Sequence, residues 1–142
     1  LIGMLAGTAL GMLAGYYRGR VETMIMRGID VVMSFPDLIL AVAITAALGA
    51  TLVNLIITIG VVMIPGFARM AHSALLSMRE REFVLAAQGL GARDRRILFK
   101  HIFPNVSHVV LVQLSIYTVL FIKAEVILSF LGVGVRVSPY SE

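Results

Sequence analysis

The sequence predicts an all-α protein, a polytopic bundle of membrane-spanning helices. Of its 142 residues, 59% are hydrophobic and 14% are charged, and the mean hydropathy is +0.96. Soluble domains carry about 25% charged residues, so a freestanding soluble domain is excluded. Residues 1–17, 38–68 and 101–122 contain no Asp, Glu, Lys or Arg. Runs of about 20 apolar residues are what a bilayer crossing requires.

Four crossings are predicted, near residues 1–17, 29–48, 53–72 and 107–130. The middle uncharged run is too long for one crossing, so we expect a hairpin that turns near residues 49–51. No basic region precedes the first apolar run, which argues against a secretory signal. We expect residues 1–142 to be part of a single transmembrane domain and a fragment of a larger core, with at least one crossing missing at each end.

The basic residues predict the orientation. Ten of the twelve follow the first crossing or lie between the third and fourth, one lies in the C-terminal segment, and Lys123 lies within a crossing. The side rich in Lys and Arg is expected to face the cytoplasm, so the first helix starts outside. The ten residues are Arg18, Arg20, Arg27, Arg69, Arg79, Arg81, Arg93, Arg95, Arg96 and Lys100.

Small residues recur on one face of the first crossing. Gly3, Gly7, Gly11 and Gly15 are spaced every four residues. Such stripes let helix backbones approach closely in a bilayer, so we expect this face to pack tightly against another helix.

Charged residues within or beside the crossings are candidates for the transport pathway. Arg27, Asp30, Ser34 and Asp37 are spaced at i, i+3, i+7 and i+10, which places them on one face of a helix. Such residues face a water-filled cavity or a partner, or they stay hydrated at the interface, with Pro36 marking the start of the membrane helix. Both interpretations stay open.

Two further features lie inside predicted crossings. Glu125 and Lys123 are two residues apart and do not face each other on a helix, so we expect partners on other helices or a position near the outer interface. Pro65 removes a backbone hydrogen bond from the third crossing. With Gly66 it marks either a hinge or a static bend.

The sequence predicts neither a catalytic site nor a metal site. There is no cysteine, and the three His and eight Met follow no ligand spacing. His72 and Ser73 are adjacent, so their side chains point apart on a helix, and an intramembrane hydrolase has no motif here. No Gly-rich phosphate loop of the nucleotide-binding type is present.

The loop at residues 79–105 carries the strongest functional signal. Phe83, Ala86, Ala87 and Leu90 have the spacing of a short amphipathic helix, which Gly89 and Gly91 should end. Asp94 is expected to cap a second helix, which Pro104 should stop. The residues alone allow an element that rests on lipid headgroups.

A resemblance to a known family gives the loop at residues 79–105 a specific functional interpretation. Leu85-Ala86-Ala87-Gln88-Gly89-Leu90-Gly91, followed by Pro104, resembles the EAA loop of ABC-importer permeases. LAGYYRGRVETMIMRGIDVVMSFPDLIL, PGFAR, REREFVLAAQGLGARDRRILFKHIFPN and LSFLGVGV resemble the dipeptide/oligopeptide/nickel permease family along nearly the whole chain. Leu85 departs from the motif, which has Glu there, and His101 stands where the motif often has Ile. Met63-Ile64 before the Pro-Gly pair and Lys123 in an apolar helix are further departures.

The resemblance implies a type I importer-like fold whose loop is a cytoplasmic coupling helix. Ala86, Ala87 and Gly91 would allow close approach to an ATPase subunit, and Phe83 would fill an apolar pocket. Arg81 and Glu82, with Arg79 and Glu80, would make contacts at the rim. Pro104 completes the motif.

The resemblance also implies a function and partners. The chain would be a permease subunit in a bacterial cytoplasmic (inner) membrane, importing di- or oligopeptides or, alternatively, nickel. It would not be an enzyme and would bind no cofactor, since ATP and Mg would be held by partners. Expected partners are two cytoplasmic ATPase subunits, a second homologous permease subunit, an extracytoplasmic solute-binding protein and the bilayer; no nucleic acid is expected.

The rival hypothesis is an ion-coupled secondary transporter that uses Asp30, Asp37 or Glu125.

Overall fold

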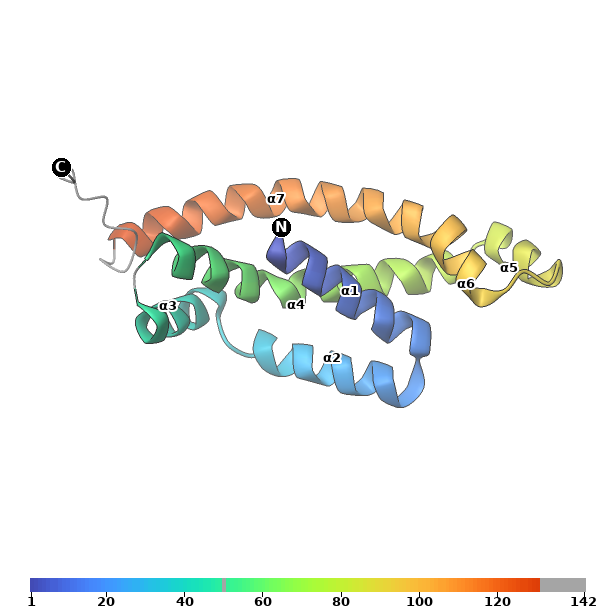
Figure 1. Ribbon diagram of the computed structural model, residues 1–142, viewed down its shortest axis with the longest axis horizontal. Helices are drawn as coiled ribbons and strands as arrows, with labels where there is room; N and C mark the ends of the chain where they lie inside the picture. The colour runs from blue at the N-terminus through green and yellow to red at the C-terminus, as the bar shows by residue number, and fades with distance from the viewer. Residues whose placement is uncertain (50, 131–142) are drawn as a thin grey trace.

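The structure, a computed structural model, describes residues 1–49 and 51–130. Every regular element in these two ranges is helical, which confirms the all-α prediction (Figure 1). In chain order the elements are α1 (Ile2–Tyr17), α2 (Gly19–Met33), α3 (Asp37–Leu48), α4 (Leu52–Arg79), α5 (Glu82–Gly89), α6 (Asp94–Ile97), a π-helical turn (Leu98–Ile102) and α7 (Phe103–Phe130).

Helix α4 is the central helix of the bundle. It contacts α1, α2, α3 and α7 (Figure 1). Its N-terminus is capped by the Thr51 hydroxyl, which accepts a hydrogen bond from the Asn54 backbone N–H at 3.2 Å. The amide of Asn54 also donates to the Leu48 carbonyl at 2.5 Å, which fastens the turn between α3 and α4. The predicted hairpin near residues 49–51 therefore joins α3 to α4 at this point.

The glycine face of α1 packs closely against another helix, as predicted, and that helix is α4. All four glycines are buried. A Cβ on Gly3 would lie 2.5 Å from the Gly60 carbonyl oxygen, and a Cβ on Gly11 would collide with the carbonyl of Ala68. The two backbones are thus too close for any side chain between them, which is the geometry that small-residue stripes allow.

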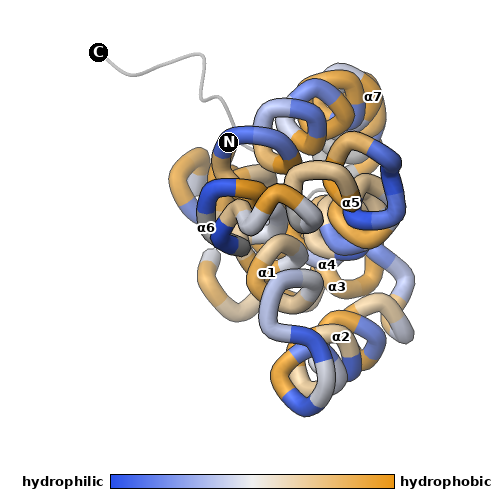
Figure 2. The backbone as a smooth tube through the Cα atoms, turned by 90° about the vertical axis from the view of Figure 1, so that its right-hand side faces the viewer, coloured by the Kyte–Doolittle hydropathy of each residue, from blue (hydrophilic) through white to orange (hydrophobic). Residues whose placement is uncertain are grey.

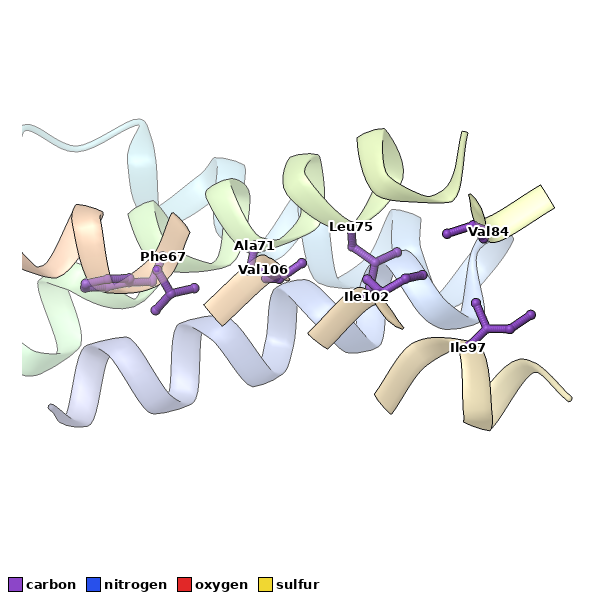
Figure 3. Packing of buried hydrophobic residues seen from close by; sticks show 8 residues of the cluster. Phe67, Ala71, Leu75, Val84, Ile97, Ile102 and Val106 are labelled. Carbon is purple, nitrogen blue, oxygen red and sulfur yellow. The ribbon is translucent and has the colours of Figure 1, made fainter. Parts of the chain in front are cut away.

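One apolar cluster fastens the 79–105 loop to the bundle (Figure 3). Val84 of α5, Ile97 of α6 and Ile102 of the π-helical turn are buried with the α4 and α7 side chains. Those partners are Phe67, Ala71, Leu75, Val106 and Val110. The 79–105 loop is therefore packed against the ends of α4 and α7 through a shared hydrophobic core.

The stretch 29–48, expected as one crossing, is two helices. Between them α2 and α3 bend by 86°, and Pro36, in an extended conformation (φ −59°, ψ 131°), precedes the first residue of α3. Proline has no N–H to donate and disfavours a helical conformation in the residue before it, which ends α2. The prediction that Asp37 shares one helix face with Arg27 and Asp30 is therefore wrong.

Pro104 does not stop the second loop helix, contrary to expectation. It is the second residue of α7, and the π-helical turn leads into α7 without a break. Proline is tolerated in the first turn of a helix, where its missing N–H costs little. The neighbouring Asn105 amide donates to the His101 carbonyl at 2.6 Å and supports the junction.

Among the described residues, two helical stretches are long and apolar enough to cross a bilayer, by length and composition: α4, and residues Leu98–Leu120 of the π-helical turn and α7. The bent pair α2–α3 counts as a third if it forms one broken span. Helix α1 is apolar but has 16 residues, fewer than the roughly 20 that a crossing needs. The described residues thus form a multi-pass membrane bundle, and the four crossings as bounded above stay a prediction.

Candidate functional site

The loop with the coupling-helix pattern lies at one end of the bundle. Helices α5 and α6 lie at the same end as the turn between α1 and α2, whereas the α3–α4 turn lies at the opposite end (Figure 1). Seen along the bundle from this end, hydrophilic segments of α2, α5 and α6 face the viewer (Figure 2). Both loops that the positive-inside rule assigns to the cytoplasm therefore share one end, as that assignment requires.

Helix α5 has an anchored face and a free face. Val84 is fully buried and Ala87 is partly buried against the core cluster. Phe83 is 44% exposed, Leu90 is 90% exposed, and Ala86 is exposed with them. Phe83 and Ala86 lie on one face of α5, and the exposed Leu90 follows directly after its last residue, Gly89; these three residues are called the free face of α5 below. An apolar face pointing away from the bundle is what a docking helix needs, since a partner can cover it.

The residue that anchors α5 to the bundle, Val84, is not one that the sequence pattern predicted. The predicted apolar stripe grouped Ala87 with Phe83, Ala86 and Leu90, but Ala87 packs inward. Val84, which the stripe left out, is the residue that holds the helix. Its apolar character was the only signal in the sequence, and Leu85 beside it is 53% exposed with the same character.

Backbone geometry explains one of the two glycines that follow the stripe. Helix α5 ends at Gly89, and Gly91 has a φ of +77°, a conformation that glycine adopts without strain. A Cβ on Gly91 would meet no atom of the described chain within 4 Å. The turn thus requires glycine here for its backbone, and close approach to a partner stays a prediction.

The charged residues around α5 divide into two groups. Arg81 and Glu82 are exposed, in keeping with rim positions. Arg79, expected at the rim with them, instead donates through Nη1 to the Gly15 carbonyl of α1 at 3.3 Å. Pro104 is exposed at the start of α7. The structure thus brings Arg81, Glu82 and the free face of α5 together at one end, and coupling by these residues stays a prediction.

The candidate pathway residues do not form one site. Asp30 pairs with the Arg69 guanidinium of α4. Asp37 lies on α3 and lines a cavity of about 130 Å³ between α3, α4 and α7. The side chain of Glu125 lies outside the described part of the structure. A carboxylate held by a guanidinium is a poor cation site, so the geometry gives the ion-coupled hypothesis no support at Asp30.

The candidate hinge borders the same cavity as Asp37. Pro65 is buried within an unbroken α4, and Pro65 and Gly66 both line the cavity. A Cβ on Gly66 would collide with the Tyr117 hydroxyl, and the Phe67 and Tyr117 rings lie 4.8 Å apart. Packing of α7 against α4 therefore accounts for Gly66, and hinge motion stays a prediction.

Sequence reasoning missed a second polar contact between α2 and α4. His72 Nε2 of α4 lies 2.7 Å from Glu22 Oε1 of α2, and the two side chains are 12% and 26% exposed. The partners are distant in sequence, so no local pattern could pair them. Among the described residues, no group of three or more His, Cys, Asp or Glu could hold a metal ion.

Comparison with known proteins identifies the family. Residues 7–140 match the family described as "Binding-protein-dependent transport system inner membrane component". The chain is 38% identical over 136 residues to the glutathione transport system permease protein GsiD of Pectobacterium atrosepticum, covering 96% of this chain and 45% of that protein. It is 39% identical to the dipeptide transport system permease protein DppC of Alkalihalophilus pseudofirmus, with 94% and 44% covered.

A third relative agrees with these two. The dipeptide transport system permease protein DppC of Lactococcus lactis is 35% identical over 136 residues, covering 96% of this chain and 40% of that protein. The chain thus spans less than half the length of the relatives that it matches. With its helical membrane bundle and its matched residues, this chain belongs to the family of binding-protein-dependent transport system inner membrane components.

Proposed function

We propose that this chain is part of the permease subunit of an ATP-driven importer for small peptides in a bacterial inner membrane. Three relatives carry names that specify dipeptide or glutathione transport by a permease. The sequence has no phosphate loop of the nucleotide-binding type. In the proposed importer, energy comes from a separate ATPase, which holds ATP and Mg.

The observation that carries the proposal is the free face of α5. Phe83, Ala86 and Leu90 expose an apolar surface, with the charged Arg81 and Glu82 beside it. An apolar centre with a polar rim is the usual anatomy of a protein interface. Val84 packs in the same apolar cluster as Leu75, near the C-terminal end of α4. A displacement of α5 by a bound partner would therefore be transmitted to α4.

The remaining partners follow from the proposed class of transporter. Two cytoplasmic ATPase subunits would each engage one permease subunit, so a second homologous permease completes the membrane part. A solute-binding protein would deliver the peptide on the outer side, in keeping with the family's description.

A bulky residue on the free face tests the proposal. In the full-length permease, Ala86→Trp should abolish co-purification with the ATPase subunits, or reduce it at least tenfold, because the indole holds the docking surfaces apart. Gly91→Trp is a weaker probe, because its positive φ would strain the turn itself. Co-purification is measured by quantitative immunoblot of the detergent-extracted complex.

The matched control is Ala47→Trp, at an exposed alanine of α3 near the opposite end of the bundle. This variant should keep the ATPase bound. Normal co-purification and normal ATP-driven uptake by Ala86→Trp would refute the docking role of α5.

A further inference from the structure

Polar contacts tie the C-terminal half of α4 to its neighbours. Arg69 pairs with Asp30 of α2, His72 pairs with Glu22 of α2, and Arg79 donates to the Gly15 carbonyl of α1. Arg69, His72 and Arg79 lie within one face of α4 by helical periodicity. This half of α4 ends directly before α5.

Helix α2 meets α4 with both polar and apolar side chains. Ile29 is buried, and Ile25 and Met26 are partly buried on the side of α2 that carries Glu22. Glu22 and Asp30 are about two turns apart on α2, whereas Arg69 and His72 are one turn apart on α4. Two pairs separated along α2 fix both its position and its rotation, which a single pair cannot do.

The two contacts have different surroundings. The Glu22–His72 pair is mostly buried, so water screens it little, and neutral histidine can still donate a hydrogen bond to the carboxylate. The Asp30–Arg69 pair is half exposed. Charges in a membrane protein rarely occur without such partners.

We propose that Glu22 and Asp30, with His72 and Arg69, are positioning residues that make α2 move together with α4. These four residues form the α2–α4 clasp. The proposal rests on the proposed function, because α5 is what would move α4. Through the bend at residues 34–36, displacement of α2 shifts α3, whose Asp37 lines the cavity shared with Pro65 and Tyr117. The clasp thus links the loop to that cavity.

A charge swap tests the clasp in the full-length permease, assembled with its ATPase and binding protein in liposomes. Asp30→Asn and Arg69→Gln should each lower peptide uptake per ATP hydrolysed by roughly fivefold or more, a typical size for energetic coupling between sites. The double variant Asp30→Arg with Arg69→Asp should restore most of the ratio. Arg20→Gln, at an exposed position of α2, is the control and should change nothing.

A cross-link tests the same idea without relying on charge. This chain has no cysteine, and in a full-length permease freed of any other cysteine, Glu22→Cys and His72→Cys can be joined by a short bis-maleimide. Because the clasp moves as a unit, the cross-linked transporter should keep its uptake. Loss of uptake on cross-linking, unchanged ratios in the single variants, or a swap that restores nothing would overturn the clasp. In each case retained ATPase binding and retained wild-type uptake would leave the proposed function standing.

Discussion

At the scale of single residues, the glycines of α1 show what spacing can and cannot predict. Their four-residue repeat predicted a close helix contact, and the structure confirms one. The repeat could not name the partner, because spacing defines a face of one helix and says nothing of what lies opposite. The α4 residues that receive that face are Gly60, Ile64 and Ala68, and the large Ile64 between the two small residues hides the repeat in the sequence.

Replacing one of these glycines should loosen the bundle. Gly11→Ala places a methyl group against the Ala68 carbonyl, and overpacking of this kind costs about 1–3 kcal/mol. We expect a lower midpoint of thermal unfolding in detergent, followed by size-exclusion chromatography of heated samples.

The control is the same substitution on α2. A Cβ on Gly28 meets nothing within 4 Å, so Gly28→Ala should leave the midpoint unchanged or raise it slightly, since alanine favours helix. Equal midpoints for the two variants would contradict the close α1–α4 contact.

At the scale of elements, the two prolines near helix ends separate what was predictable from what was not. Pro36 lies at the break between α2 and α3, whereas Pro104 lies in α7 just after the π-helical turn, where the helical path is unbroken, although both follow an aromatic residue in the chain. A proline blocks the helix that precedes it but fits the first turn of the helix that follows. Which effect dominates depends on the packing of Ile102 and Val106 against α4, which local sequence does not record.

The candidate site was predictable in position but not in orientation. The motif at residues 85–91 located α5, and Gly89 ended it as expected. An eight-residue helix with apolar residues on several sides has no single apolar face, so periodicity could not distinguish the anchored side of Val84 from the free side of Phe83.

Truncating the anchor should release α5 from the bundle. Val84→Ala removes two buried methyl groups, worth about 1–2 kcal/mol at roughly 0.8 kcal/mol each. That change should raise the open population of the loop, and with it the rate of trypsin cleavage beside Arg81 and Arg93, by roughly tenfold. Leu85→Ala, at a half-exposed position, should have little effect. Equal cleavage rates in both variants would remove Val84 from its role as anchor.

At the scale of the whole molecule, the two basic loops share one end and the α3–α4 turn lies at the other (Figure 1). This arrangement predicts opposite accessibility across the membrane. Leu90→Cys should react with a membrane-impermeant maleimide only after the membrane is permeabilised, whereas Leu52→Cys should react in intact spheroplasts. Both side chains are exposed, so burial does not separate them. The reverse labelling pattern would place α5 outside the cell.

The central claim is that the free face of α5 touches an ATPase subunit. A photo-reactive amino acid at position 90 of the full-length permease, activated by light in native membranes, tests that contact directly, with position 52 as the matched leucine control. We expect a covalent product with the ATPase subunit from position 90 and none from position 52. No such product from position 90 in an actively transporting complex would contradict the account.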